Sequence, residues 1–532
     1  MTARAIVALV VFVAAAVASA AEPPAPSAPP RAGEVVLAAD FEDADPLAGW
    51  KVYPAGTVAA EAGFQSPHAV RVEVAADAAK RTAFAEMSLP VERMRGCTIL
   101  LSARIKAENV SAKPQSWNGI KFMAPYTAGG SRSHPQAEIG TGTFDWRRVT
   151  WQASVPADAE KMVLLLGLEN VTGRVWFDDV RVTVRRPLPP MPAAVAAGKS
   201  VYRGHTLPRL RGAMVGTSID EDGLRTLGRD WNANVIRWQL CGYKPRTDTG
   251  DLAAYDKMLD DHLRRLDAIL PLCEKYGILV CVDLHTGPGQ WAAGDRNLFA
   301  SPACQKRFIE IWQMIARRYK DSRAVWAYDL LNEPHESSVS EEADDWQGLA
   351  ERAARAIREI DPQRAIIVEP ASGGDPSGMR TLRPIAVANV IYSPHMYAPI
   401  EFTHQGVFSP GAAPVTYPGT IAGKPWDKAA LEKVLAPTVA FQRAYGAAIF
   451  IGEFSAIRWA PDGSGARYLK DCIDIFESHG WDWAYHAFRE WDGWSVEHGP
   501  DRNDRPRAAS PTDRQKVLCD WYAKNEKPAM RR

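Results

Sequence analysis

The sequence predicts an α/β protein, a (β/α)8 TIM barrel, preceded by an all-β jelly-roll sandwich domain. Eight apolar, strand-like runs alternate with helical or loop segments over about 320 residues after residue 200, as in a parallel barrel. Between residues 34 and 186, short alternating runs separated by turn residues are typical of an antiparallel sandwich. A chain of 532 residues is also too long for a single hydrophobic core.

The N-terminal segment has the features of a secretory signal. Arg4 precedes an unbroken apolar run, and Ala18-Ser19-Ala20 forms a small-x-small cleavage site. An uncleaved anchor is the alternative, and no later run approaches the length of a membrane helix. We therefore expect a secreted or periplasmic protein. The predicted order is a signal peptide (1–21), a Pro/Ala-rich linker (22–33), the sandwich (34–186), a second Pro/Ala-rich linker (187–200) and the barrel (201–526).

The elements follow in chain order. Within the sandwich, runs such as "CTILLSARIKA" and "GRVWFDDVRVTV" alternate with a period of two. In the barrel region, residues 255–273 carry apolar side chains at three- and four-residue spacing up to Gly277, which predicts a helix. Ser301-Pro302 marks the start of another. The predicted barrel strands are 210–216, 234–240, 278–285, 325–331, 365–370, 390–397, 448–455 and 482–491.

A doubly wound open sheet is the competing architecture. Such sheets usually carry a Gly-rich phosphate turn after the first strand, whereas "TGPGQW" (286–291) lacks the third glycine and follows the third strand. The barrel is therefore preferred, and no nucleotide cofactor is expected.

Composition limits the possible partners. Lys plus Arg (63) equals Asp plus Glu (63), so the chain has no basic field for nucleic acid or an anionic membrane surface. Seven scattered cysteines form no C-x-x-C pair, and Cys241 and Cys281 are interpreted as small buried hydrophobes. No H-E-x-x-H cluster and no G-x-S-x-G elbow is present, which disfavours a metallohydrolase and a serine esterase. We expect neither a metal nor a cofactor.

Polar side chains gather at the carboxyl ends of the predicted barrel strands, which open on one face. Taken singly, a buried Arg or His is more often a structural group with satisfied hydrogen bonds. The coincidence over six strands instead indicates an active site. By strand, these residues are Arg237 (second), Asp283 and His285 (third), Asn332 and Glu333 (fourth), His395 and Tyr397 (sixth), Glu453 (seventh), and Glu490 and Trp491 (eighth).

Two of these residues are the candidate catalytic pair. Glu333 and Glu453 lie three strands apart, so in an eight-stranded barrel they face each other across the mouth. Cleavage of a glycosidic bond requires such a pair, because one carboxyl protonates the leaving oxygen while the other attacks the anomeric carbon or directs water to it. A separation of about 5–5.5 Å would indicate a retaining mechanism, and a wider one an inverting mechanism.

Five short motifs resemble glycoside hydrolase family 5: "IRW" (236–238), "DLH" (283–285), "NEP" (332–334), "SPHMY" (393–397) and "IGEFS" (451–455). The resemblance covers roughly residues 205–495. It implies that Glu333 is the general acid/base and Glu453 the nucleophile, with Arg237 near Glu453. It also implies that His285 and Asn332 bind sugar hydroxyls, that His395 and Tyr397 are partners of the carboxylates, and that Trp491 is a stacking floor.

The sandwich resembles the galactose-binding-like domains found as carbohydrate-binding modules, through "FEDADPLAGW" (41–50) and "GRVWFDDVRVTV" (173–184). Glycan binding through Trp117, Trp146 or Trp151 is one interpretation, and a packing or spacer domain without a ligand is the other.

The prediction for the whole chain is a secreted retaining hydrolase acting on a polysaccharide or oligosaccharide, with no nucleic acid partner and no membrane contact after signal cleavage. The resemblance favours an endo-β-1,4-glucanase of the cellulase type. A β-mannanase, another β-glucanase and an exo-β-glycosidase share the chemistry and remain open, as does a glycan-binding barrel without activity. Oligomeric state is left open.

Overall fold

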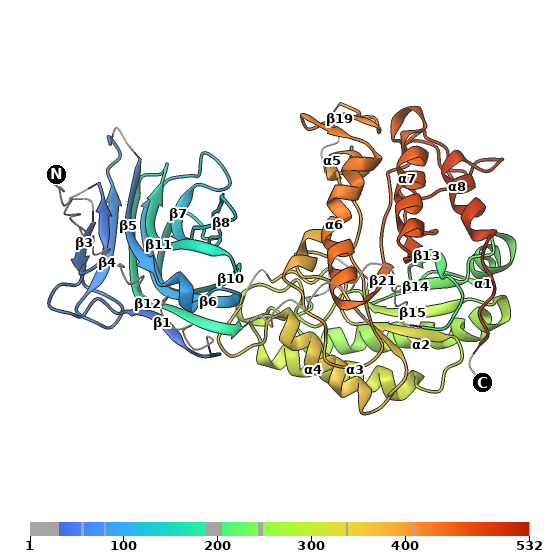
Figure 1. The fold of residues 1–532 in the computed structure, drawn as a ribbon, viewed down its shortest axis with the longest axis horizontal. Helices are drawn as coiled ribbons and strands as arrows, with labels where there is room; N and C mark the ends of the chain where they lie inside the picture. Colours follow the sequence, from blue (N-terminus) through green and yellow to red (C-terminus); the bar gives the residue numbers. More distant parts are fainter. Residues whose placement is uncertain are drawn as a thin grey trace, which may run out of the picture.

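The computed structural model describes residues 31–54, 58–78, 81–187, 205–242, 248–336, 339–408, 411 and 413–530. The predicted signal peptide, residues 22–30 of the first linker and, except for Pro187, the second linker lie outside these residues. Figure 1 shows two bodies side by side, a sandwich of strands in blue and cyan and an α/β body running from green to red.

The first body is a sandwich of two antiparallel sheets, as predicted. In one sheet the order is β10-β6-β12-β4-β3 with β1 on β12, and in the other β2-β5-β11-β8-β9 with β7 on β11. Ile99 and Leu101 of β6 face Leu164 and Leu166 of β11 in one apolar core. The strands are β1 (Val35–Ala39), β2 (Lys51–Tyr53), β3 (Val58–Glu61), β4 (Ala69–Val74), β5 (Thr82–Leu89), β6 (Cys97–Val110), β7 (Gly119–Met123), β8 (Tyr126–Ala128), β9 (Ser131–Ser133), β10 (Gly142–Val155), β11 (Ala159–Glu169) and β12 (Gly173–Pro187).

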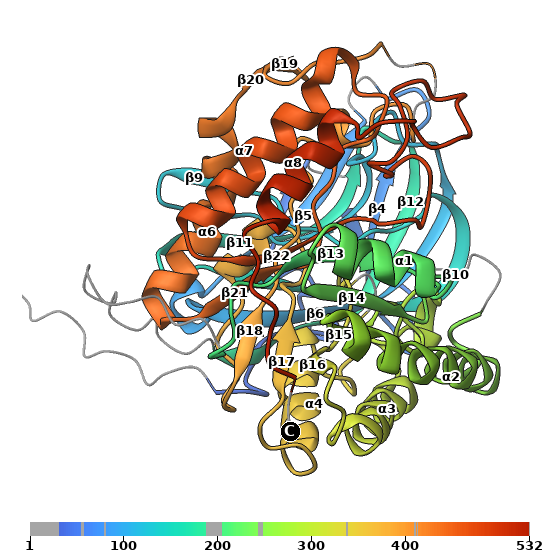
Figure 2. The ribbon, with the colours of Figure 1, turned by 90° about the vertical axis from the view of Figure 1, so that its right-hand side faces the viewer.

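The second body is a closed barrel of eight parallel strands, which confirms the predicted fold class. Each predicted barrel run contains one strand, and Figure 2 shows helices on opposite sides of them. The strands are β13 (Arg211–Val215), β14 (Val235–Leu240), β15 (Leu279–Leu284), β16 (Val325–Asp329), β17 (Ala365–Val368), β18 (Val390–Tyr392), β21 (Ala448–Ile451) and β22 (Asp482–Tyr485).

The residues predicted to begin or end helices α2 and α3 do so in the structure. The Asp251 carboxylate accepts the N–H groups of Ala253 and Ala254 at the start of α2, which ends at Gly277 in the left-handed region (φ 66°). Ser301 caps α3. The helices are α1 (Glu221–Arg225), α2 (Leu252–Tyr276), α3 (Pro302–Tyr319), α4 (Trp346–Arg358), α5 (Ile400–Thr403), α6 (Lys428–Tyr445), α7 (Ser464–Ser478) and α8 (Asp513–Tyr522). Short helical turns η1 (Val91–Arg93), η2 (Thr226–Asp230), η3 (Gly294–Arg296), η4 (Pro376–Arg380) and η5 (Pro461–Gly463), and a hairpin of β19 (Gly419–Ile421) and β20 (Lys424–Trp426), complete the described elements.

Three strand predictions are too long by four or more residues at their carboxyl ends. The sixth strand ends at Tyr392, the seventh at Ile451 and the eighth at Tyr485. Beyond the sixth and eighth strands the backbone no longer forms a regular ladder and makes single hydrogen bonds to the ends of neighbouring strands. After Tyr485, for example, the N–H of Phe488 donates to the carbonyl of Met214. Glu490 and Trp491 therefore lie in the loop after β22, and His486 is the residue that directly follows this strand.

No helix among the described residues has both the length and the apolar character needed to cross a bilayer.

Candidate active site

A buried guanidinium lies at the centre of the barrel's carboxyl end. Arg237, on β14, is fully buried, since all six residues of that strand face packed surroundings. Its three nitrogens contact groups from four other strands or their ends. These partners are Asp329 Oδ2 (2.8 Å), Glu453 Oε1 (2.7 Å), Glu369 Oε1 (2.7 Å), Asn332 Oδ1 (3.1 Å) and Asp283 Oδ1 (3.0 Å).

The charges of this cluster determine which carboxyl groups ionise. Burial lowers the pKa of Arg237, but the acidic groups around it, Asp283 first among them, outweigh burial and keep the guanidinium charged. Burial raises the pKa of Asp329 to about 8 in spite of Arg237, so this carboxyl holds a proton near neutral pH. Burial also raises the pKa of Glu369, against the opposing effect of His395 and Arg237. Arg237 thus binds carboxyl groups that differ in their protonation.

Glu453, directly after β21, has the environment of an ionised carboxylate. It accepts hydrogen bonds from Arg237 Nη1 and from Tyr397 Oη (2.8 Å). Burial raises its pKa, but the positive charges of His395, His486 and Arg237 outweigh burial and hold the pKa below its ordinary value. Glu453 is therefore unprotonated at neutral pH, which a carboxylate nucleophile requires.

Glu333, after β16, is held by its backbone and remains partly open to solvent. Its φ of 45° lies in the left-handed region, which costs a non-glycine residue free energy, and its N–H donates to Glu369 Oε2 at 2.8 Å. The side chain is 33% exposed. One carboxyl oxygen each of Glu333 and Glu453 and a ring nitrogen of His395 all lie within 4.8 Å of one another. The two carboxyl groups therefore meet at one point of the mouth.

His395 links the two halves of the site. Its Nδ1 lies 3.0 Å from Glu333 Oε1 and 3.9 Å from Glu453 Oε2, and its Nε2 lies 3.3 Å from Glu369 Oε1. Burial lowers the pKa of His395, but Glu369 and Glu453 outweigh burial and raise it well above its ordinary value. The imidazolium therefore lies between Glu333 and Glu453 on its Nδ1 side and Glu369 on its Nε2 side.

The remaining predicted site residues lie at the same mouth. His285 Nδ1 lies 2.8 Å from Asp283, and Asn332 is buried beside Arg237. Trp491 is 43% exposed, and its ring lies 5.5 Å from that of Trp494 and 6.0 Å from that of Trp459. Binding of sugar hydroxyls by His285 and Asn332, and stacking on Trp491, stay predictions.

Sequence reasoning missed Glu369 and His486. Glu369 follows β17, the one strand between the fourth and seventh to which no polar residue was assigned, although the same strand-end rule applies to it. His486 was hidden because the eighth strand was predicted to continue to residue 491. Its Nδ1 lies 2.8 Å from Tyr397 Oη, and its Nε2 lies 3.5 Å from Glu490, which in turn accepts from Gln239 Nε2 (2.8 Å).

A family model and curated relatives agree on one family of enzymes for the barrel. The family model "Cellulase (glycosyl hydrolase family 5)" matches residues 196–492. Endoglucanase C of Acetivibrio thermocellus is 29% identical over 246 residues, covering 41% of this chain and 71% of that protein. Cellodextrinase A of Ruminococcus flavefaciens is 26% identical over 270 residues, covering 49% of this chain and 76% of that protein. A solved structure of Thermotoga maritima Cel5A with cellobiose is 24% identical, with a TM-score of 0.45 over 58% of this chain and 96% of that one.

We predict that Glu369→Gln moves the alkaline limb of the kcat/KM profile to lower pH. The amide keeps the shape of the side chain but removes a negative charge that favours protonated His395, so the pKa of His395 falls and its proton is lost earlier as pH rises. We expect kcat/KM near neutral pH to fall by about 10- to 100-fold.

The control for this prediction is Glu477→Gln. Glu477 also binds a buried arginine, Arg211, but at the opposite end of the barrel (2.6 Å). Its pH profile should match that of the wild type. An alkaline limb unmoved in Glu369→Gln would contradict the assigned role of Glu369.

Proposed function

Because the chain belongs to glycosyl hydrolase family 5, we propose that this enzyme cleaves β-glycosidic bonds of a polysaccharide by a retaining mechanism with two glutamates. The observation that carries the proposal is the approach of Glu333 and Glu453, which each present a carboxyl oxygen within 4.8 Å of the other. Their environments also differ, since Glu453 is buried among positive charges while Glu333 is partly exposed.

The short separation favours retention over inversion. Retaining glycosidases hold the two carboxyl groups about 5–5.5 Å apart, whereas inverting enzymes leave about 6.5–9.5 Å to admit a water molecule. One oxygen of Glu333 and one oxygen of Glu453 lie within 4.8 Å of each other, which supports the shorter, retaining separation. Glu453 is therefore assigned to direct attack on the sugar.

Each step uses groups whose positions are known. Glu453 attacks the anomeric carbon while Glu333 protonates the departing glycosidic oxygen, which leaves a sugar ester on Glu453. Glu333 then removes a proton from water, and that water breaks the ester. Arg237 and Tyr397 hold Glu453 in place for the attack. His395, bonded to Glu333 Oε1, orients this carboxyl for both proton transfers.

We propose that the enzyme is an endo-β-1,4-glucanase. Two relatives carry the names endoglucanase and cellodextrinase, and these names support a β-glucan substrate. A β-mannanase, another β-glucanase or an exo-β-glycosidase would use the same chemistry. We also propose that the protein is secreted or periplasmic, on the signal-like features of residues 1–21.

Removal of either glutamate should abolish most hydrolysis. For Glu333→Gln we expect kcat on β-glucan to fall by about 10²- to 10⁴-fold, the usual contribution of a general acid/base. For Glu453→Gln we expect a loss of about 10³-fold or more, because no nucleophile remains. Glu310→Gln, on the outer helix α3, is the control and should keep full activity, as measured by release of reducing sugar. Turnover like that of the wild type in Glu333→Gln or Glu453→Gln would refute the assignment.

The anomer of the first product should match that of the substrate. We expect proton NMR spectra recorded during the first minutes of cleavage to show the β-anomer first, followed by slow mutarotation. Running the same assay on soluble β-glucan, mannan, xylan and aryl glycosides would identify the substrate class. Initial appearance of the α-anomer would contradict the retaining mechanism.

A second candidate function concerns the sandwich. Trp117 is 59% exposed, and its backbone carbonyl accepts from the buried Lys121 and from Gln136 (3.4 Å). The segment carrying Trp117 borders a cavity of about 470 Å³ with a mostly polar lining that includes Lys113, Asn118 and Glu138. An exposed indole on a segment that borders a polar cavity suits a sugar ring and its hydroxyls. We therefore propose that the sandwich binds glycan at Trp117.

The other two tryptophans predicted to bind glycan are less exposed than Trp117. Trp151 is 8% exposed and packs edge-to-face on Phe122 inside the sandwich core, so its assignment as a glycan ligand is wrong. Trp146 is half-buried against Phe64, which leaves less of its face open. Sequence alternation gave no means to separate the three.

Glycan binding by the sandwich can be measured in the full chain made inactive by Glu453→Gln. We expect Trp117→Ala to weaken retardation in gels containing soluble β-glucan by about 10-fold, the usual effect of losing a central aromatic contact. Tyr53→Ala, which removes another exposed aromatic of the sandwich (44% exposed), is the matched control. Equal retardation of the Trp117 and Tyr53 variants would refute this site.

A further inference from the structure

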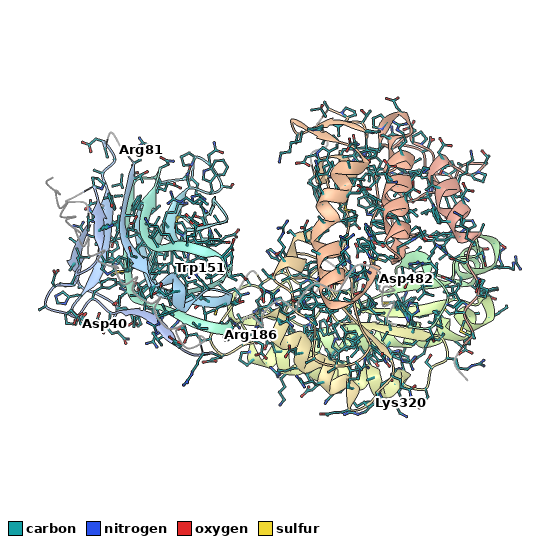
Figure 3. The ribbon with its side chains drawn as sticks, in the orientation of Figure 1. Asp40, Arg81, Trp151, Arg186, Lys320 and Asp482 are labelled. Atoms are coloured by element: carbon teal, nitrogen blue, oxygen red, sulfur yellow. The ribbon has the colours of Figure 1, made fainter. Side chains whose placement is uncertain are left out.

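The sandwich packs directly against the barrel. The outer face of its β10-β6-β12 sheet should be exposed, because side chains alternate between the core and the opposite face. Yet Thr98, Leu100 and Ser102 on the outer face of β6 are only 6%, 6% and 2% exposed. Leu100 also belongs to the apolar cluster of the barrel and not to that of the sandwich. The barrel therefore covers this face, and Figure 3 places Arg186 where the two bodies meet.

Among the described residues, hydrogen bonds and an ion pair join the covered face to the segment of the barrel between β16 and α4. Arg186 Nη2 donates to Asp345 Oδ2 at 2.5 Å, and Gln152 Nε2 donates to Glu336. Arg185 donates to the backbone carbonyls of Ser340 (3.4 Å) and Ala343. Of the ion pairs at this junction, Arg186–Asp345 is the shielded one, since Asp345 is 8% exposed at its side chain.

The same segment carries Glu333 at its start. Its far end is tied to the active site, because Trp346 N donates to Glu336 Oε1 (2.5 Å) and Trp346 Nε1 donates to the carbonyl of Glu369 (2.7 Å). Glu369 in turn accepts the N–H of Glu333 at 2.8 Å. A continuous set of hydrogen bonds therefore runs from the sandwich to the backbone of the proposed acid/base.

We propose that the sandwich is a positioning part of the catalytic unit, and that Gln152 and Arg186 hold the segment after β16 so that Glu333 stays aligned for proton transfer. The inference rests on the proposed function of Glu333. Glu333 needs such support because its φ of 45° is unfavourable for a non-glycine residue and persists only where surrounding contacts impose it. Residues far from the reacting atoms can thus affect one chemical step, because small misalignments of a catalytic group are costly.

Leaving-group dependence tests the proposal in the full chain. Two aryl β-cellobiosides are compared by kcat/KM: phenyl, whose departure needs a proton from Glu333, and 2,4-dinitrophenyl, whose departure does not. For the double variant Gln152→Ala/Arg186→Ala we expect a loss of about 10- to 100-fold on the phenyl glycoside and less than about 2-fold on the dinitrophenyl glycoside. Arg186→Lys, which keeps the charge, should recover part of the loss.

Two control variants separate this role from a general loss of structure. Arg174 lies on the same strand as Arg186, and it pairs with Glu73 (3.1 Å) within the sandwich. Arg174→Ala should therefore leave kcat/KM unchanged on both substrates. Arg148→Ala removes an exposed junction pair with Glu341 (2.9 Å; side chains 43% and 46% exposed) and should change little. Equal losses of the double variant on both substrates, or no loss on either, would overturn the inference.

Glu333→Gln in the same assay tells the two proposals apart. If this variant shows the large loss on phenyl cellobioside alone and the double variant does not, the positioning role fails while the acid/base assignment stands. If Glu333→Gln loses equally on both substrates, the assignment of Glu333 itself fails.

Discussion

The active site depends on the burial of one cation, Arg237, among the carboxyl groups of the barrel mouth. Four carboxyl side chains from different strands converge on its guanidinium, each within 3.0 Å. Burying that many acids together would be prohibitive without a positive partner, and removing the partner would leave anions in a dry interior. The strand ends can therefore meet at one point only because β14 supplies an arginine there.

Arg237 gives Glu333 and Glu453, the two catalytic candidates, different environments. Glu453 is held deep in the site by Arg237 and Tyr397, whereas Glu333 lies at its edge, bonded to His395 and partly exposed. One carboxyl is thus stabilised as an anion in a buried place, and the other is partly open to solvent. His395 and Glu369 connect them, so a change of charge at one carboxyl is felt at the other.

The sequence was sufficient for the barrel and for most of the mouth, because apolar runs set the strands and parallel strands place their carboxyl ends together. Asn332 and Glu453 were found from strand-end position, whereas Arg237, which was assigned to a strand end, lies in the interior of β14. His486 was not found, because the alternation in "DWAYHAFREW" continues past Tyr485, where β22 ends. The docking of the sandwich on the segment after β16 was also beyond reach, because polar outer-face residues such as Gln152 carry no mark of the partner that covers them.

The central claim is that Glu453 forms the covalent bond to the sugar. Incubation with 2,4-dinitrophenyl 2-deoxy-2-fluoro-β-cellobioside, which forms the glycosyl ester quickly and releases it slowly, followed by proteolysis and peptide mass spectrometry, tests it most directly. The account predicts one equivalent of fluorocellobiosyl ester on the peptide containing Glu453. An ester on Glu333, Glu369 or Glu490, or no ester while the enzyme still turns over ordinary substrates, would contradict it.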